Sequence, residues 1–302
     1  MARLPHIRTR IGHVVCVFLL LLLRPSFAES PPIAPSELVR EVVRNETDTS
    51  SDTSKYMFLD RRQNLRNSQT KLMVETRDAM AGMIVANDDH PLSAADRQAE
   101  LARVRRFVND PEELRRKQRQ ERDTADRINR IVKALPDAFL YDYAGTETGR
   151  TGVGNPGDEL VRLKFRPNPK YQSPSRVEQV LSGMQGIILI DAQKKRIAQI
   201  DGNLVKEVSF GWGILGHLDP GGHFLVEQGD VGDDHWEITR MHLNFTGKVL
   251  LFKSISMQII ETFSDFRRVP AGLTFAQGVE LLEKEQEKWA GNSQQAGNQR
   301  AQ

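Results

Sequence analysis

Residues 236–263 read WEITRMHLNFTGKVLLFKSISMQIIETF, and apolar and polar side chains alternate over most of this stretch. A period of two residues is typical of β-strands that bury one face. We expect two strands, Trp236–Phe245 and Val249–Phe263, joined by a hairpin turn at Thr246-Gly247-Lys248. In the first strand the apolar side chains change faces near Arg240, which predicts a β-bulge or a strong bend.

Strands are also expected between Asp137 and this pair. Val161, Leu163 and Phe165 alternate with basic residues, as in a strand with one buried face. Turn patterns separate further strands. Of three short segments nearer the N-terminus, the second alternates as a strand (Leu72, Val74, Thr76), and the other two have weaker strand patterns. The turns are 192–195 and Asp219-Pro220-Gly221-Gly222, and the segments are 55–63, 70–77 and 79–86. We therefore predict an α+β fold whose curved antiparallel sheet wraps around helices; the resemblance described below implies that this sheet is an incomplete, half-open β-barrel.

Two long helices are predicted between the groups of strands. Ser93 opens the first with a capping box, and Asp110-Pro111 places a capping residue and a proline at the start of the second. The second helix should end at Leu135, before a proline. Its segment Arg115–Asp123 interleaves bases with acids at i,i+3 and i,i+4 spacing, which favours a solvated face over a phosphate-binding patch.

The sequence predicts one folded domain, 36–270, that contains a charged helical insertion at 93–135. A flexible lead, 29–35, precedes a short helix at Ser36–Arg44. Residues 271–302 are expected to form a helix, Phe275–Trp289, followed by a tail rich in Gln, Asn and Gly that should be disordered.

The first 28 residues match a secretory signal peptide. Three arginines precede an unbroken apolar run, Val14–Leu23, and small residues stand before a cleavage site at Glu29. The run is shorter than the roughly 20 residues that a membrane span needs, so we expect cleavage, a periplasmic location and no stable membrane span afterwards. The only cysteine, Cys16, lies inside the run, so the mature chain would have neither disulfides nor thiolate chemistry.

Charge gives no reason to expect a nucleic-acid partner. The whole chain has 42 basic and 40 acidic residues, and cleavage before Glu29 would remove four arginines and no acid. The mature chain would then carry 38 bases against 40 acids, a net charge of −2, which lacks the basic surface that nucleic acid requires.

The motifs that suggest catalysis or cofactors do not have the structural context that they require. Gly152-Val153-Gly154-Asn155-Pro156-Gly157 has the spacing of a dinucleotide-binding loop, but a proline interrupts it and a strand follows where a helix is needed. His217, His223, His235 and His242 lack the spacing of metal ligands. No nucleophile elbow occurs. We therefore expect no enzyme activity, no cofactor and no metal.

Large apolar side chains in the strand half of the chain are the candidate binding residues. Each could simply belong to the core, but some could line an apolar cavity between the curved sheet and the helices. These candidates are Phe210, Trp212, Phe224, Trp236, Leu251 and Met257.

Several strand segments carry a resemblance to a known group of exported proteins. Residues 186–191 (GIILID), 196–200 (RIAQI), 204–213 (LVKEVSFGWG) and 235–237 (HWE) resemble the outer-membrane lipoprotein-sorting superfamily, the LolA/LolB-like carriers and receptors of the Lol pathway. They are similar to a branch of large uncharacterised exported bacterial proteins. The resemblance implies an incomplete β-barrel with an apolar cavity that holds acyl chains. It assigns no individual site residue.

The sequence therefore predicts a periplasmic protein that binds or carries a lipid, a lipoprotein acyl chain or another hydrophobic molecule. The alternative is an envelope scaffold that binds a protein partner through the charged helix 111–135. The first function depends on an apolar cavity, and the second depends on the exposed middle of this helix.

Overall fold

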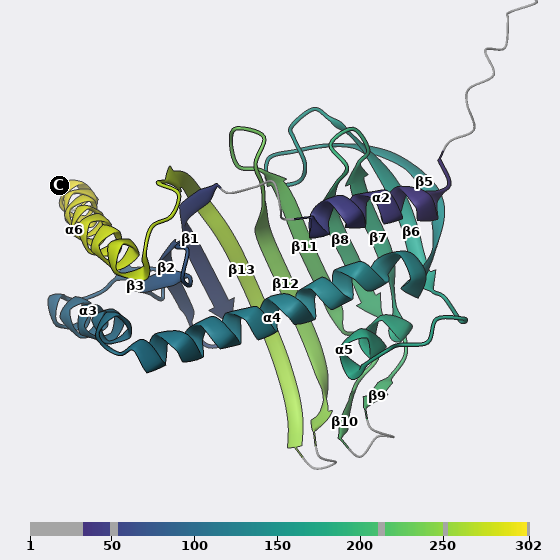
Figure 1. The fold of residues 1–302 in the computed structure, drawn as a ribbon, viewed down its shortest axis with the longest axis horizontal. Helices are drawn as coiled ribbons and strands as arrows, with labels where there is room; N and C mark the ends of the chain where they lie inside the picture. The colour runs from purple at the N-terminus through teal and green to yellow at the C-terminus, as the bar shows by residue number, and fades with distance from the viewer. Residues whose placement is uncertain (1–32, 49–53, 211–214, 250–252, 301–302) are drawn as a thin grey trace, which may run out of the picture. The chain divides into compact units, whose positions relative to one another are not determined.

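The computed structural model describes residues 33–48, 54–210, 215–249 and 253–300, and its helices and strands belong to one compact unit that begins at Pro35. The predicted signal peptide, 1–28, lies outside the described residues. The unit is an α+β fold with five α-helices and an open antiparallel sheet, as the sequence predicted (Figure 1). The sheet is curved and does not close into a barrel.

The sheet has thirteen strands, and most of them follow one path. The order along this path is β4-β3-β2-β1-β13-β12-β11-β8-β7-β6-β5, while β10 joins β12 to β9. The strands are β1 (Lys55–Asn64), β2 (Ser68–Val74), β3 (Ala81–Asn87), β4 (His90–Pro91), β5 (Phe139–Thr148), β6 (Glu159–Pro167), β7 (Met184–Asp191), β8 (Arg196–Leu204), β9 (Val208–Phe210), β10 (Gly216–Leu218), β11 (His223–Asp230), β12 (Trp236–Val249) and β13 (Lys253–Val269).

Two groups of helices cover different parts of this sheet. The helices are α2 (Pro35–Thr47), α3 (Ala94–Asn109), α4 (Pro111–Ala138), the short α5 (Arg176–Gln179) and α6 (Phe275–Arg300). The face that packs against α2 and α4 is called the inner face here, and it carries residues such as Ile188 and Leu243. The opposite, outer face carries Met57 and Leu72 and packs against α3 and α6.

The inner-face core fills the space between strands β5–β8 and helices α2 and α4. Val39 and Val42 of α2 are fully buried there against Leu163, Ile188 and Leu204, which come from three different strands. Helix α2 contributes its apolar stripe because Leu38, Val39, Val42 and Val43 recur with helical spacing. This core holds the C-terminal end of α4 through Leu135.

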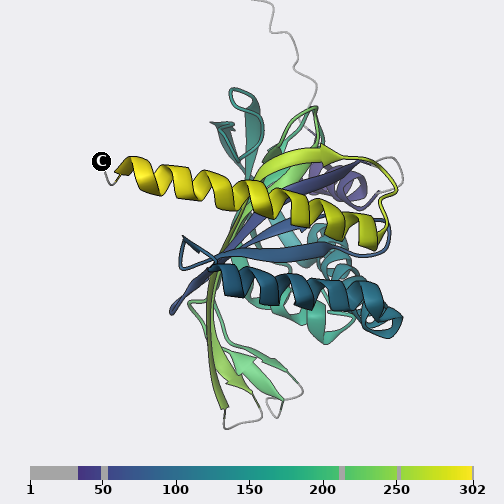
Figure 2. The same cartoon turned by 90° about the vertical axis from the view of Figure 1, so that its left-hand side faces the viewer.

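The outer-face core lies at the other end of the sheet. Figure 2 shows α6 and α3 against the strands β1–β3, where Phe275 and Leu282 of α6 are buried with Met83. Strand pairing settles the face: Leu59 is paired with Leu72, and Leu72 with Met83, so these side chains share one side. The middle of the inner face is therefore covered by neither core.

Helix α3 closes the free edge of β3. The Glu100 carboxylate accepts the Ile84 backbone N–H at 2.7 Å, and Arg103 donates to the Gly82 carbonyl oxygen at 3.0 Å. Arg103 also pairs with Glu100 at 2.6 Å. The two side chains thus pair with backbone groups of β3 that have no strand partner, because β4 has only two residues. A bare edge would be a template for pairing with another chain.

The hairpin turn at 246–248 was predicted wrongly. Strand β12 continues to Val249, with Gly247 paired to Ile255 on β13 and to Leu218 on β10, so the connection to β13 falls at 250–252, outside the described residues. Gly247 is required for another reason: a Cβ there would overlap the carbonyl oxygen of His217. The predicted bulge near Arg240 is confirmed, because the register between β11 and β12 shifts at that point.

Both predicted helix starts are confirmed, whereas two helix ends lie further along the chain than predicted. Ser93 caps α3 through the Asp96 N–H, and the Asp110 carboxylate accepts the N–H groups of two residues in α4. Helix α4 passes through Pro136 and ends at Ala138. Pro136 and Ala138 are both buried in the last turn, where a proline removes only one backbone hydrogen bond. Helix α6 continues to Arg300 through the segment expected to be disordered; no proline stops it, although its Gly and Asn residues favour helix only weakly.

Replacing Glu100 by glutamine should destabilise the protein by about 2 kcal/mol at pH 7, because Arg103 loses its charged partner. Burial opposes ionisation, but hydrogen bonds from Arg103 and Ile84 hold the pKa of Glu100 below its ordinary value. Its stabilising contribution is therefore present above the unfolded pKa, about 4.3, and is lost as the pH falls through the lower folded pKa. Urea unfolding at pH 7 and at pH 3 should show a gap between wild type and Glu100→Gln only at pH 7.

The matched control is Glu112→Gln, which removes the carboxylate of an exposed ion pair with Arg115. We expect a change within about 0.5 kcal/mol, because exposed pairs contribute little. An equal loss in both variants would contradict the role assigned to Glu100.

Candidate functional site

Helix α4 crosses the inner face as a bridge that is held at its two ends (Figure 1). In the first half of α4 the Glu121 carboxylate accepts the Met80 N–H at 3.1 Å, and near its C-terminal end Leu135 is buried in the inner-face core. Every residue from 122 to 130 is exposed, including Ala125 and Ile128. A helix packed on a sheet would bury one stripe of side chains. The middle of α4 therefore leaves space between itself and the strands.

A pocket of about 650 Å³ lies where α4 passes the ends of β1–β3. The α4 residues that line it recur every three or four positions, from Lys117 through Glu121 and Ala125 to Ile128, so they form one side of the helix. Met73, Ala79 and Met80 supply apolar surface on the side of the strands. The volume falls within the range of small-molecule sites, about 300–1,000 Å³.

An aromatic and apolar surface continues from this pocket along the inner face. Phe58 packs against Phe263 and Phe266, with ring centroids 6.1 and 5.2 Å apart. Met73 is paired with both Phe58 and Gly82, and the glycine gives it room, because a Cβ there would come within 2.7 Å of the Met73 sulfur. Met241, Leu243 and Ile259 extend the surface across β12 and β13, and all these side chains are only half-buried. We call this surface, with the pocket, the inner-face groove.

On the strand surface of the inner-face groove, four charged residues form two cross-strand pairs. Asp60 lies opposite Lys71 on β2, and Arg62 lies opposite Glu261 on β13. The Arg62 Nε and Glu261 Oε1 atoms are 3.8 Å apart. One carboxylate oxygen of Asp60 is buried and accepts no hydrogen bond from any described residue.

Burial dominates the ionisation of the two carboxyl groups in these pairs. It raises the pKa of Asp60, and the positive charges of Lys71 and Arg62 only partly offset the effect. It also raises the pKa of Glu261, with the Asp60 charge acting in the same direction. Raised pKa values in a groove are a feature of functional sites as well as of structural ion pairs.

The inner-face groove can therefore bury an elongated apolar molecule and offer it charged and hydrogen-bonding groups along one side. No three His, Cys, Asp or Glu side chains converge as metal ligands anywhere in the described part of the chain. Of the four histidines considered above, His223 and His242 approach most closely, with ring centroids 5.3 Å apart, and His223 contacts Asp201 at 2.9 Å.

Of the six residues predicted from sequence to bind a ligand, the structure describes four, and it places them in more than one cluster. Phe210 and Phe224 are half-buried against the inner-face core, and Met257 lies on the same face opposite Phe245. Trp236 is buried in a separate cluster with Leu160 and Leu189, and Leu189 points to the side of β7 opposite Ile188. Trp212 and Leu251 lie outside the described residues.

Sequence reasoning missed the residues of the groove at β1 and β2. The alternation Phe58, Asp60, Arg62 was available as a signal, but it places two charges on a face that otherwise reads as buried. Segment 55–63 therefore looked like a weak strand, and the pairing of β1 with β13, far away in the sequence, could not be read from it.

No protein-family model, curated protein or solved structure was found to match this chain. Among the described residues, none of the helices is long and apolar enough to cross a membrane.

Replacing Asp60 by asparagine should stabilise the protein at pH 7. Because the folded pKa is raised, the contribution of Asp60 to stability is fully present below its unfolded pKa and is lost as the pH rises through the folded pKa. Asparagine removes this cost of burying a charge, so the advantage of Asp60→Asn should vanish below about pH 4. Thermal unfolding at pH 7 and at pH 3.5 measures both effects.

The control is Asp142→Asn, from an exposed pair with Arg166, which should leave stability unchanged at both pH values. A loss of stability in Asp60→Asn at pH 7 would show that the ion pair with Lys71 outweighs burial.

Proposed function

We propose that this chain is an exported, periplasmic protein that binds or carries a lipid, a lipoprotein acyl chain or another hydrophobic molecule in the inner-face groove. The observation that carries the proposal is a half-buried aromatic and apolar floor that lies under the middle of α4, whose residues 122–130 are all exposed. Such a floor remains partly hydrated when empty. Full burial of one large apolar side chain is worth roughly 1.5–3 kcal/mol, so a ligand that covers several of them gains substantial free energy.

Three further observations support the proposal. The pocket is lined by α4 together with β1, β2 and the turn before β3, and the apolar strand surface beside it continues over β12 and β13, so an elongated ligand could lie along the strands with α4 across it. The first 28 residues have the pattern of a signal peptide. The strand segments resemble the lipoprotein-sorting superfamily, whose members hold acyl chains in an open barrel.

Binding of this kind needs no cofactor. Half-buried methionines at Met73, Met80 and Met241 suit a ligand of variable shape, because an unbranched thioether adapts to irregular surfaces. The proposal concerns binding and transport, and it gives the charged pairs no role in a reaction.

Titration with a fluorescent fatty acid tests the proposal, and two neighbouring isoleucines provide a matched pair of variants. Ile259 lies in the groove opposite Leu243, whereas Ile260 points to the outer face opposite His242, and both are half-buried. We expect Ile259→Gln to weaken binding about tenfold or more, since a polar group replaces roughly 1.4 kcal/mol of apolar contact. Ile260→Gln should bind like the wild type.

Native mass spectrometry of the mature protein from a detergent-free envelope extract complements the titration. A retained acyl-containing molecule would support the proposal. A protein that is empty and also takes up no fluorescent fatty acid would overturn it.

A further inference from the structure

The inner-face groove changes from apolar to polar along β1 and β2. The paired positions on this face are first Phe58 with Met73, then Asp60 with Lys71, and then Arg62 with Gln69. Asn64 is the last inner-face residue of β1. At roughly 3.4 Å per residue, about 20 Å separate Phe58 from Asn64. An apolar end and a polar end at this separation match the dimensions of an amphiphile.

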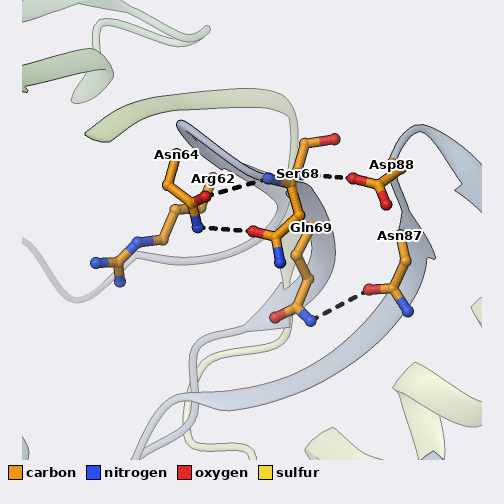
Figure 3. Close-up of a pocket in the computed structure, with 7 residues that line it drawn as sticks. Arg62, Asn64, Ser68, Gln69, Asn87 and Asp88 are labelled. Carbon is orange, nitrogen blue, oxygen red and sulfur yellow. Dashed lines mark hydrogen bonds between the residues drawn. The ribbon is translucent and has the colours of Figure 1, made fainter. Parts of the chain in front are cut away.

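A second pocket, of about 540 Å³, lies at the polar end (Figure 3). It is formed by the end of β1, the start of β2 and the end of β3, and all of its side chains are polar. They are Arg62, Asn64, Asn67, Ser68, Gln69, Asn87 and Asp88. Arg62 and Gln69 also belong to the groove, so the pocket continues the groove beyond its charged pairs.

Hydrogen bonds within the pocket fix the directions of its amide groups. Gln69 donates to the Asn87 side-chain oxygen at 3.2 Å, and Asn64 donates to the Asn67 side-chain oxygen at 2.6 Å. The Ser68 N–H donates to Asp88 at 2.8 Å, as Figure 3 shows. Side chains held in this way lose little further entropy when a ligand binds.

The pocket keeps both donors and acceptors for a ligand. These hydrogen bonds use the oxygen atoms of the Asn67 and Asn87 amides but not their NH₂ groups, and they use the NH₂ group of Gln69 but not its oxygen. The charges of Arg62 and Asp88 have opposite signs, and Asp89 is neutralised by a bidentate ion pair with Arg61 at 2.7 Å. A neutral group with several hydroxyls, each of which donates and accepts, fits this set better than a phosphate or an amine.

We propose that this polar pocket binds the hydroxylated headgroup, a sugar or another polyol, of an amphiphile whose chain lies in the inner-face groove. The inference rests on the proposed function and specifies its class of ligand. The headgroup hydrogen-bonds with the amides of Gln69, Asn67 and Asn87. The chain runs past Asp60 and Lys71 toward Phe58 and Met73.

Binding of three probes tests the inference by isothermal titration calorimetry of the mature chain. Decyl β-maltoside and decyl phosphocholine share a chain and differ in headgroup, and methyl β-maltoside has the headgroup without the chain. All are used below the concentrations at which micelles form. We expect the wild type to bind decyl maltoside at least about tenfold more tightly than decyl phosphocholine, and methyl maltoside weakly.

The double variant Gln69→Met with Asn87→Leu removes two amides that bond to each other, and an exchange of both partners for apolar groups of similar shape is compatible with folding. It should lose the preference for maltoside and keep its affinity for decyl phosphocholine. The control Gln63→Met, on the outer face of the same strand opposite Ile260, should retain the preference. Met73→Gln, at the apolar end of the groove opposite Phe58, should weaken both decyl probes equally.

Each outcome separates the inference from the proposed function. Equal affinity of the wild type for both decyl probes would overturn the headgroup assignment and leave apolar binding intact. Methyl maltoside that binds as tightly as decyl maltoside would overturn the amphiphile in favour of a free sugar. Failure of every decyl probe to bind would overturn the proposed function as well.

Discussion

The pairing of β1 with β13 is the constraint on which the rest of the structure depends. It joins residues 55–64 to residues 259–269 and so connects the first four strands to the remaining sheet. Without this ladder the chain would form two smaller sheets, each with its own helices. With it, the outer-face core around Met83 and the inner-face core around Ile188 lie on opposite sides of one continuous sheet. The middle of the inner face is then left to α4 alone.

This arrangement explains the contrast between the ends of α4 and its middle. Glu121, in the first half of the helix, accepts the Met80 N–H just before β3, and Leu135, near the C-terminal end, is buried in the inner-face core. The nine residues from 122 to 130 satisfy their backbone hydrogen bonds within the helix and keep their side chains in water. The charged segment just before them carries i,i+3 and i,i+4 ion pairs, which stabilise a helix without a packed face.

The charged pairs on the groove floor reduce the stability of the folded protein. An apolar pair at the positions of Asp60 and Lys71 would stabilise the fold more. The free-energy cost of desolvating the Asp60 carboxylate exceeds its attraction to Lys71 and Arg62. Polar groups retained at such cost commonly serve binding, and here they lie between an apolar surface and a pocket made of amides. The groove is thus apolar at one end and polar at the other, unlike a uniformly apolar cavity.

The sequence by itself determined the fold class, the strand alternation, both capped helix starts and the bulge beside Arg240, because each depends on neighbours a few residues away. It did not determine the end of β12. Gly247 is needed because the backbone of β10 passes too close for a side chain, and not because the chain turns there. Nor did it determine the groove: Phe58 meets Phe263 only through the β1–β13 ladder, and Trp236 lies in a separate buried cluster with Leu160 and Leu189. Contacts between residues two hundred positions apart leave no local pattern in the sequence. Only the tertiary structure therefore decided where the apolar surface and the two pockets lie.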